Sequence, residues 1–142
     1  MAGAVLSGAI AAVDFDAAKA ELRRAVEDFL TQLFAKAPDT DVARAAGYAV
    51  LGSGHRWRAR CRCRREDLSR RSLQARLCLR PAASSLPHAA SLVLDDLPSM
   101  DDAAIRRGKP CTHHAFPAWA ADMTPVFLVT LAYRISLDIP RS

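Results

Sequence analysis

The stretch LPHAASLVLDDLPSMDDAAIRRGKPCTHHAF, residues 86–116, holds an apolar run that ends in two adjacent aspartates. These are Asp95 and Asp96, and Asp101 follows after four further residues. Two adjacent arginines and a lysine come next, and three histidines belong to the same stretch. Carboxylates at the end of an otherwise buried helix are costly unless a cation or a solvent-filled cleft compensates them. The pattern therefore indicates a site for a metal ion and a diphosphate.

Length and composition favour one all-α domain. A chain of 142 residues buries a single core of ordinary size. Its residues are 51% hydrophobic but only 6% aromatic, and many of the hydrophobic ones are alanine and leucine, which favour helices. We therefore treat residues 1–142 as one domain.

Apolar residues recur at helical spacing in several parts of the chain. They predict a helix from Asp16 to about Ala37 and a second one, capped by Thr40 or Asp41, that ends at Leu51. Further helices are expected over residues 87–94 and 119–137, the latter interrupted near Pro125 because proline cannot donate a helical hydrogen bond. Between these two helices we expect a short helix or turn over residues 100–107.

The segment before this stretch differs from the rest of the chain. Between Arg56 and Arg80 ten arginines face two acidic residues, whereas acidic residues are in excess outside this window. Residues 60–85 show neither a helical stripe nor a strand alternation that could bury a face. The net charge of +5 thus belongs to one segment.

Three interpretations of this segment compete. It could bind nucleic acid, but it lacks interleaved aromatic residues for base stacking. Cys61, Cys63 and Cys78 with His88 could bind zinc, although their spacing is unusual for a zinc finger. We prefer the third interpretation, that residues 59–86 are anomalous because they are translated in a shifted frame. We accordingly expect no nucleic-acid partner.

The chain carries no evident targeting signal. The opening MAGAVLSGAIAAVDFD lacks a basic segment and reaches Asp14 early, so we expect no signal peptide. No transit peptide is visible, and no apolar stretch approaches the length of a membrane span. We expect the protein to act in the cytoplasm or in a plastid.

The sequence DDLPSMDDAAIRRGKP resembles the first aspartate-rich motif of the trans-isoprenyl (polyprenyl) diphosphate synthases, D-D-x-x-x-x-D followed by R-R-G-K-P. The preceding HAASLV, the following H-x-x-F and the weaker GSGHRWR fit the same family, in particular its geranylgeranyl diphosphate synthase type. The resemblance implies an all-α fold, a partial isoprenoid synthase helical bundle. The sequence differs from the family pattern at His55, Ala59, Pro125 and Val126. It also contains no second aspartate-rich motif.

The resemblance also implies roles for individual residues. Asp95 and Asp101 would be ligands of Mg²⁺, with Asp96 supporting them. Arg106 would bind an allylic diphosphate. Isopentenyl diphosphate would be bound by His55, Arg58, His88 and Arg107. Ala90 and Ser91 are small and would leave room for a longer product.

The function implied by the resemblance is prenyl transfer in isoprenoid biosynthesis, in which isopentenyl diphosphate is condensed with an allylic diphosphate. We expect a homodimer, or a heterodimer with a related synthase, and little or no turnover by this chain because it lacks the second motif. The alternative is a non-catalytic regulatory subunit that partners a full-length synthase.

Overall fold

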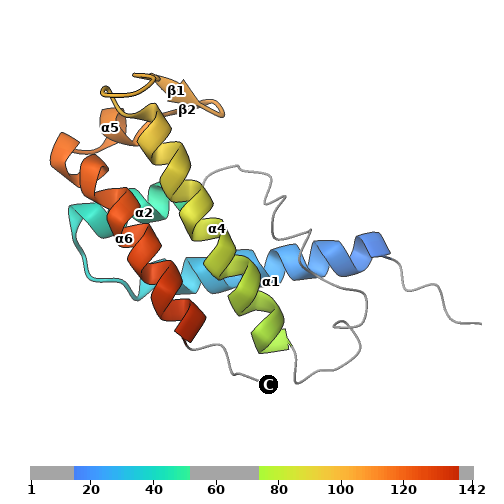
Figure 1. Ribbon diagram of the computed structural model, residues 1–142. Coiled ribbons are helices and arrows are strands. Elements are labelled where there is room, and N and C mark those ends of the chain that lie inside the picture. Colours follow the sequence, from blue (N-terminus) through green and yellow to red (C-terminus); the bar gives the residue numbers. More distant parts are fainter. Residues whose placement is uncertain (1–14, 52–73, 138–142) are drawn as a thin grey trace, which may run out of the picture.

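The computed structural model describes residues 15–51 and 74–137, which form helices, one small hairpin and the loops that connect them (Figure 1). The prediction of an all-α protein is therefore confirmed. The elements are α1 (Phe15–Ala35), α2 (Asp41–Leu51), α4 (Gln74–Asp96), β1 (Ile105–Arg106), β2 (Lys109–Pro110), α5 (Thr112–Ala115) and α6 (Ala118–Leu137).

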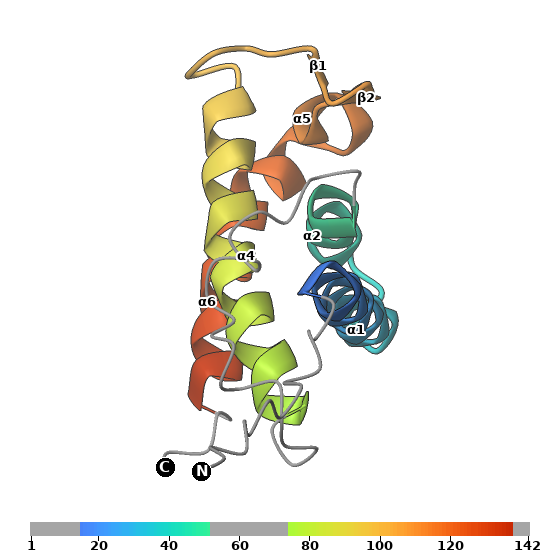
Figure 2. The same cartoon turned by 90° about the vertical axis from the view of Figure 1, so that its right-hand side faces the viewer.

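The long helices α4 and α6 lie side by side and form one layer of the molecule. The helices α1 and α2 form a second layer against them, as the side view shows (Figure 2). The hairpin β1–β2 and α5 lie together at the C-terminal end of α4. This arrangement places the polar end of α4 beside the hairpin and away from the core.

The core lies where α1, α4 and α6 meet. Val26 and Leu30 from α1, Leu86 from α4 and Leu128 from α6 are fully buried within one hydrophobic cluster. Alanines of α2 and α4 fill the space around them, which lets the helices approach closely.

The start of α2 is capped as predicted. The backbone N–H of Ala43 donates to Oγ1 of Thr40 at 3.2 Å, which satisfies one of the free donors of the first helical turn. The predicted ends of the first two helices agree with the structure to within two residues.

The helix α4 begins much earlier than predicted. We expected no helix in residues 60–85, yet α4 starts at Gln74 and passes through Pro81 and Pro87. Ala82 and Ala83 near the end of this segment, and Leu86 directly after it, are buried in the core. The expectation was wrong for residues 74–85 because the packing of these buried residues on α1 and α6 outweighs the helix-breaking tendency of proline. Residues 59–73, which hold most of the anomalous segment, lie outside the described residues.

The helix α6 is continuous through Pro125, so the predicted interruption was also wrong. Pro125 is buried, and Thr124, Ala121 and Leu128 around it are buried as well. Packing on both sides of the proline therefore holds the helix together despite the missing backbone donor.

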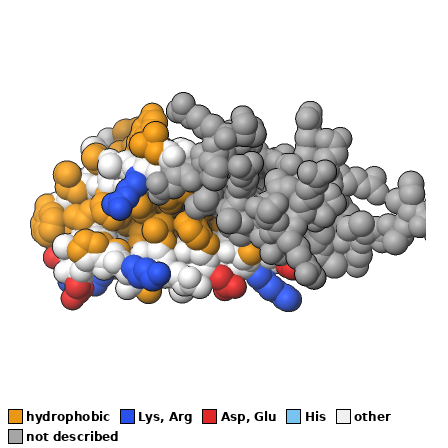
Figure 3. All heavy atoms as spheres, turned by 90° about the horizontal axis from the view of Figure 1, so that it is seen from below, with side chains coloured by type: hydrophobic (Ala, Val, Ile, Leu, Met, Phe, Trp, Pro, Cys, Tyr) orange, Lys and Arg blue, Asp and Glu red, His pale blue; other side chains and the backbone are white. Residues whose placement is uncertain are grey.

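Large apolar side chains also cover the outer face of α6. We call these residues the outer stripe, and each is at least about half exposed: Trp119, Met123, Val126, Tyr133 and Leu137. Hydrophobic side chains occupy much of the described surface in the view from below (Figure 3). Despite this apolar character, no helix among the described residues is long and apolar enough to cross a membrane.

Candidate functional site

The hairpin turns back sharply beside the end of α4. Ile105 pairs with Pro110 and Arg106 with Lys109, so Arg107 and Gly108 are the two central residues of the turn. Both have positive φ values, 53° and 77°, as in the tight turns that suit twisted hairpins. This conformation costs a residue such as arginine of order 1–2 kcal/mol, which other contacts of the hairpin must offset. Residues 100–107 thus form a turn and a strand rather than a helix.

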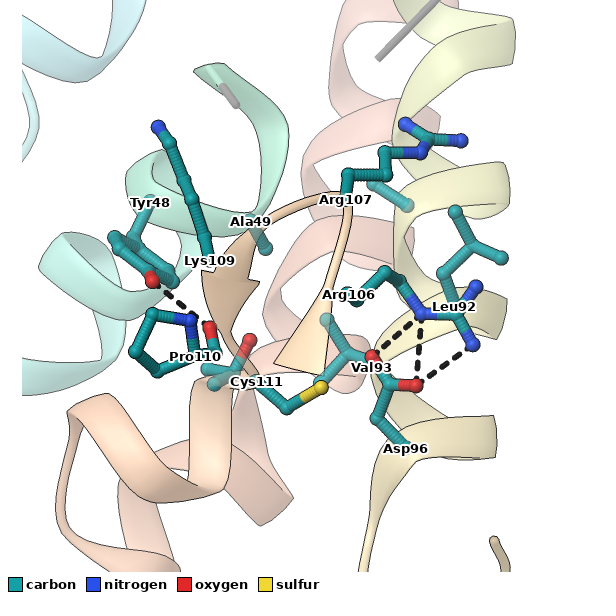
Figure 4. A pocket seen from close by; sticks show the side chains of 12 residues that line it. Tyr48, Ala49, Leu92, Val93, Asp96, Arg106, Arg107, Lys109, Pro110 and Cys111 are labelled. Carbon is teal, nitrogen blue, oxygen red and sulfur yellow. Dashed lines mark hydrogen bonds and ion pairs between the residues drawn. The ribbon is translucent and has the colours of Figure 1, made fainter. Parts of the chain in front are cut away.

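Asp96 and Arg106 form the central contact of the site (Figure 4). Nε of Arg106 donates to both carboxylate oxygens of Asp96, at 2.7 and 2.8 Å, and Nη2 lies 2.7 Å from Oδ1. The Asp96 side chain is 6% exposed and that of Arg106 is 35% exposed. The hydrogen bonds from Arg106 to Asp96 raise the pKa of the guanidinium further, so this charge pair ties the hairpin to α4.

Cys111 is a third member of this group. The residue is 2% exposed and follows directly after β2. Burial, and then its hydrogen bond with Asp96, raise the pKa of the thiol to about 11. The neutral thiol therefore predominates at neutral pH, and the Asp96 carboxylate is satisfied from two sides.

Asp95 and Asp101 differ from Asp96 because both are exposed. The backbone N–H of Asp101 donates to the carbonyl oxygen of Asp95 at 3.0 Å, which holds the loop against the end of α4. Two exposed carboxylates are thus kept at the same end of the helix, while the third faces inward.

Tyr48 joins α2 to the hairpin. Its hydroxyl donates to the carbonyl oxygen of Pro110 at 2.8 Å, and its ring meets that of Phe116 edge to face with centroids 5.4 Å apart. Nζ of Lys109 lies 5.8 Å from the centre of the Tyr48 ring, within the range of a cation–π contact.

A small cavity of about 70 Å³ lies between α2, α4 and the hairpin. Arg107 and Lys109 project from the hairpin on either side of it, whereas Arg106 points toward Asp96 (Figure 4). The residues that line the cavity are Tyr48, Ala49, Ala89, Leu92, Val93, Asp96, Arg106, Arg107, Lys109, Pro110, Cys111 and Thr112.

The structure brings some of the predicted site residues together and separates others. Asp96, Arg106 and Arg107 meet at the cavity. His88 lies half-buried on α4, and the Ser91 hydroxyl donates to its carbonyl oxygen at 2.9 Å. Ala90 belongs to the hydrophobic core and Ser91 is exposed, so neither lines the cavity. The two remaining residues, His55 and Arg58, lie outside the described residues.

Three residues of the site were not predicted from the sequence: Tyr48, Lys109 and Cys111. Lys109 belongs to the motif quoted above, but the resemblance implies no role for it, and none was predicted for Cys111. His113 and His114 lie in α5. The side chain of His113 is 7% exposed, with Nε2 3.7 Å from Oδ1 of Asp102.

The carboxylates at this site suit Mg²⁺ better than a metal ion whose ligands are all protein side chains. In residues 15–51 and 74–137 no group of three or more His, Cys, Asp or Glu side chains could hold a metal ion. Mg²⁺ typically uses one or two carboxylates and completes its coordination with water and substrate phosphate oxygens. Asp95 and Asp101 offer two exposed carboxylates of this kind.

Comparisons with known proteins identify the family of the chain. A sequence model of the polyprenyl synthetase family matches residues 40–141. The chain is 34% identical over 117 residues to a geranylgeranyl diphosphate synthase of Pseudescherichia vulneris, which covers 79% of this chain and 37% of the relative. The chain is also 44% identical over 61 residues to the chloroplastic small subunit of a heterodimeric geranylgeranyl pyrophosphate synthase of Arabidopsis thaliana. This match covers 42% of this chain and 19% of that protein.

Solved structures share the fold as well. The crystal structure of a geranyltranstransferase from Thermotoga maritima matches with a TM-score of 0.74 and 28% identity, over 84% of this chain and 45% of that chain. The chain therefore spans less than half the length of these relatives. The matched sequence, the shared fold and the aspartate-rich helix end lead to one conclusion: the chain belongs to the polyprenyl synthetase family.

Proposed function

We propose that the protein takes part in prenyl transfer in isoprenoid biosynthesis, as a component of a geranylgeranyl diphosphate synthase type of site. Such a site condenses isopentenyl diphosphate with an allylic diphosphate. One observation carries the proposal: at the end of α4, Asp95 and Asp101 are exposed while Asp96 is buried and bound to Arg106. The three carboxylates of the motif thus have two different tasks.

Asp95 and Asp101 are the proposed ligands of Mg²⁺. When bound, the ion supplies positive charge that stabilises the departing diphosphate. Asp96 supports this site indirectly, because its contacts with Nε and Nη2 of Arg106 fix the hairpin. A carboxylate already bound to a guanidinium and a thiol has little capacity left for a metal ion.

The arginines of the hairpin are the proposed diphosphate ligands. Arg107 is exposed and turns away from Asp96, so its donors are available to a phosphate group. The contacts of Arg106 with Asp96 leave Nη1 to reach the allylic diphosphate. His55, Arg58 and His88 are assigned to isopentenyl diphosphate by resemblance alone, and the role of Ala90 and Ser91 in product length remains a prediction.

The remaining predictions concern partners and location. A dimer with a second copy or with a related synthase stays a prediction, as does action in the cytoplasm or a plastid. The comparisons do not favour a purely regulatory subunit over prenyl transfer. For the 142-residue chain alone we expect little or no turnover, because its sequence has no second aspartate-rich motif.

Calorimetric titration of the purified chain with inorganic pyrophosphate tests the proposal. We expect binding that requires Mg²⁺ and that weakens about tenfold or more in a variant with Asp95→Asn and Asp101→Asn. A matched control carries Asp28→Asn and Asp122→Asn, which remove two exposed carboxylates of α1 and α6. An equal loss of pyrophosphate affinity in both double variants, or an affinity that does not depend on Mg²⁺, would count against the metal site.

A second assay addresses turnover. The chain is incubated with Mg²⁺, an allylic diphosphate and radiolabelled isopentenyl diphosphate, alone and with a full-length geranylgeranyl diphosphate synthase as the positive control. We expect no labelled product from the chain alone. Formation of such a product would overturn the prediction of inactivity while supporting prenyl transfer.

A further inference from the structure

The hairpin presents its three cationic side chains in two directions. Arg106 points toward α4 and is bound to Asp96, whereas Arg107 and Lys109 flank the cavity. Arg107 and Lys109 are both exposed, and no carboxylate of the described residues forms an ion pair with either. The exposed positive charge that is not engaged in an ion pair is therefore that of these two residues.

The size of the cavity indicates where an anion would lie. Pockets that enclose a small ligand measure roughly 300–1,000 Å³, and this cavity measures about 70 Å³. A diphosphate would consequently lie at the mouth of the cavity, between the side chains of Arg107 and Lys109. At this position it would meet the two exposed cations of the hairpin, one on each side.

Tyr48 fixes the strand that carries Lys109. The hydrogen bond from its hydroxyl to Pro110 holds the residue next to Lys109, and its ring lies 5.8 Å from the ammonium group. The edge-to-face contact with Phe116 holds the ring itself in place. Lys109 is otherwise a long and flexible side chain, so these contacts reduce the freedom that it would lose on binding an anion.

We propose that Lys109 is a further diphosphate-binding residue of this site, that it acts together with Arg107, and that Tyr48 is its positioning residue. The inference rests on the proposed function, because it concerns the same ligand and the same hairpin. It adds two residues that the aspartate-rich motif and its arginines do not identify.

Pyrophosphate titration of the 142-residue chain in the presence of Mg²⁺ tests the role of Lys109. We expect Lys109→Met to weaken binding about fivefold to tenfold, and Lys109→Arg to stay within about twofold of the unmodified chain. The control is Lys36→Met, which removes the same charge from an exposed position between α1 and α2. If Lys36→Met weakens binding as much as Lys109→Met, only the net charge matters and the assignment of Lys109 is overturned.

A double-mutant cycle tests the role of Tyr48. Tyr48→Phe removes only the hydroxyl, and we expect it to weaken binding about twofold to threefold when Lys109 is present. In the Lys109→Met background the same change should have no further effect, and Tyr133→Phe on the outer stripe should have none in either background. An equal loss in both backgrounds would overturn the positioning role, since Tyr48 would then act on the hairpin as a whole.

The same titrations separate this inference from the proposed function. If the unmodified chain binds no pyrophosphate, both fail. If it binds, and Arg107→Ala weakens binding while Lys109→Met does not, the proposed function stands and the inference about Lys109 and Tyr48 is overturned.

Discussion

The hairpin end of α4 and the outer stripe of α6 are built from opposite kinds of contact. At the hairpin end the buried carboxylate of Asp96 is paired with Arg106 and Cys111, and the hairpin is tied to α2 through Tyr48. On the outer stripe, large apolar side chains such as Trp119 and Leu137 are more than half exposed. The buried carboxylate at the hairpin end is thus paired within the described residues, whereas the apolar side chains of the outer stripe stay exposed.

The two regions therefore illustrate different roles: an exposed apolar surface can be a contact surface, and a buried charge pair can fix a local geometry. Exposed apolar patches of this kind usually mark surfaces that are covered by another part of a protein or by a partner. Paired buried charges usually mark a local geometry that must be kept. We therefore expect substitution of the buried charge pair at the hairpin end to change stability and ligand binding together, and substitutions on the outer stripe to change neither.

The largest effect is expected on the inner face of α6. Leu128 is fully buried in the core, so Leu128→Ala should lower the free energy of unfolding by about 3 kcal/mol. Leu137, which is 79% exposed on the same helix, is the matched control, and Leu137→Ala should cost less than about 0.5 kcal/mol. Urea unfolding followed by circular dichroism measures both values. Similar losses in the two variants would mean that the two faces of α6 do not differ as described.

Removal of the buried carboxylate should have the next largest effect. Asp96→Ala leaves Arg106 without its partner, and we expect a loss of about 2 kcal/mol, less than for a fully buried pair because Arg106 is one third exposed. Asp95→Ala removes the neighbouring exposed carboxylate and should cost less than about 0.5 kcal/mol. The comparison is made by urea unfolding without Mg²⁺. A larger cost at Asp95 than at Asp96 would reverse the roles assigned to the two residues.

Much of this fold could be predicted from the sequence, for reasons that are local. The periodicity of α1 and the Thr40 cap of α2 depend on residues close in sequence, and they were predicted correctly. The early start of α4 was missed because residues 60–85 show no helical stripe, while the burial of Ala82, Ala83 and Leu86 that stabilises the helix depends on distant helices. The hairpin was missed because strands of two residues carry no periodicity.

In the candidate site, too, some features follow from local sequence and others depend on residues that are distant in sequence. The sequence identified the acidic and basic residues but treated Asp95 and Asp96 as neighbours with related tasks. Their difference follows from helical phase, since Asp96 lies three residues after the buried Val93, and this signal was present in the sequence. The contact of Tyr48 with Pro110 joins residues 62 positions apart, and nothing local predicts it.

The thiol of Cys111 should make stability depend on pH in the alkaline range. Its pKa is raised from 9.0 to about 11 by burial and by Asp96, so the folded state holds the proton more tightly than the unfolded state. This contribution is fully present below pH 9 and is lost as the pH rises toward 11. Between pH 9 and 10 the unmodified chain should lose about 1 kcal/mol more than Cys111→Ser. Parallel pH profiles of the two chains in urea unfolding would contradict the burial of the thiol and its hydrogen bond with Asp96.

The smallest effect on stability is expected from the outer stripe. A triple variant with Val126→Gln, Tyr133→Gln and Leu137→Gln replaces exposed apolar side chains by good helix formers, so the free energy of unfolding should change by less than about 0.5 kcal/mol. Static light scattering of concentrated solutions should decrease, because less apolar surface is available for contact between molecules. A loss of more than about 1.5 kcal/mol would instead show that the stripe is already packed against other residues of the chain. That result would remove the contrast between α6 and the hairpin end of α4, since both regions would then be satisfied internally.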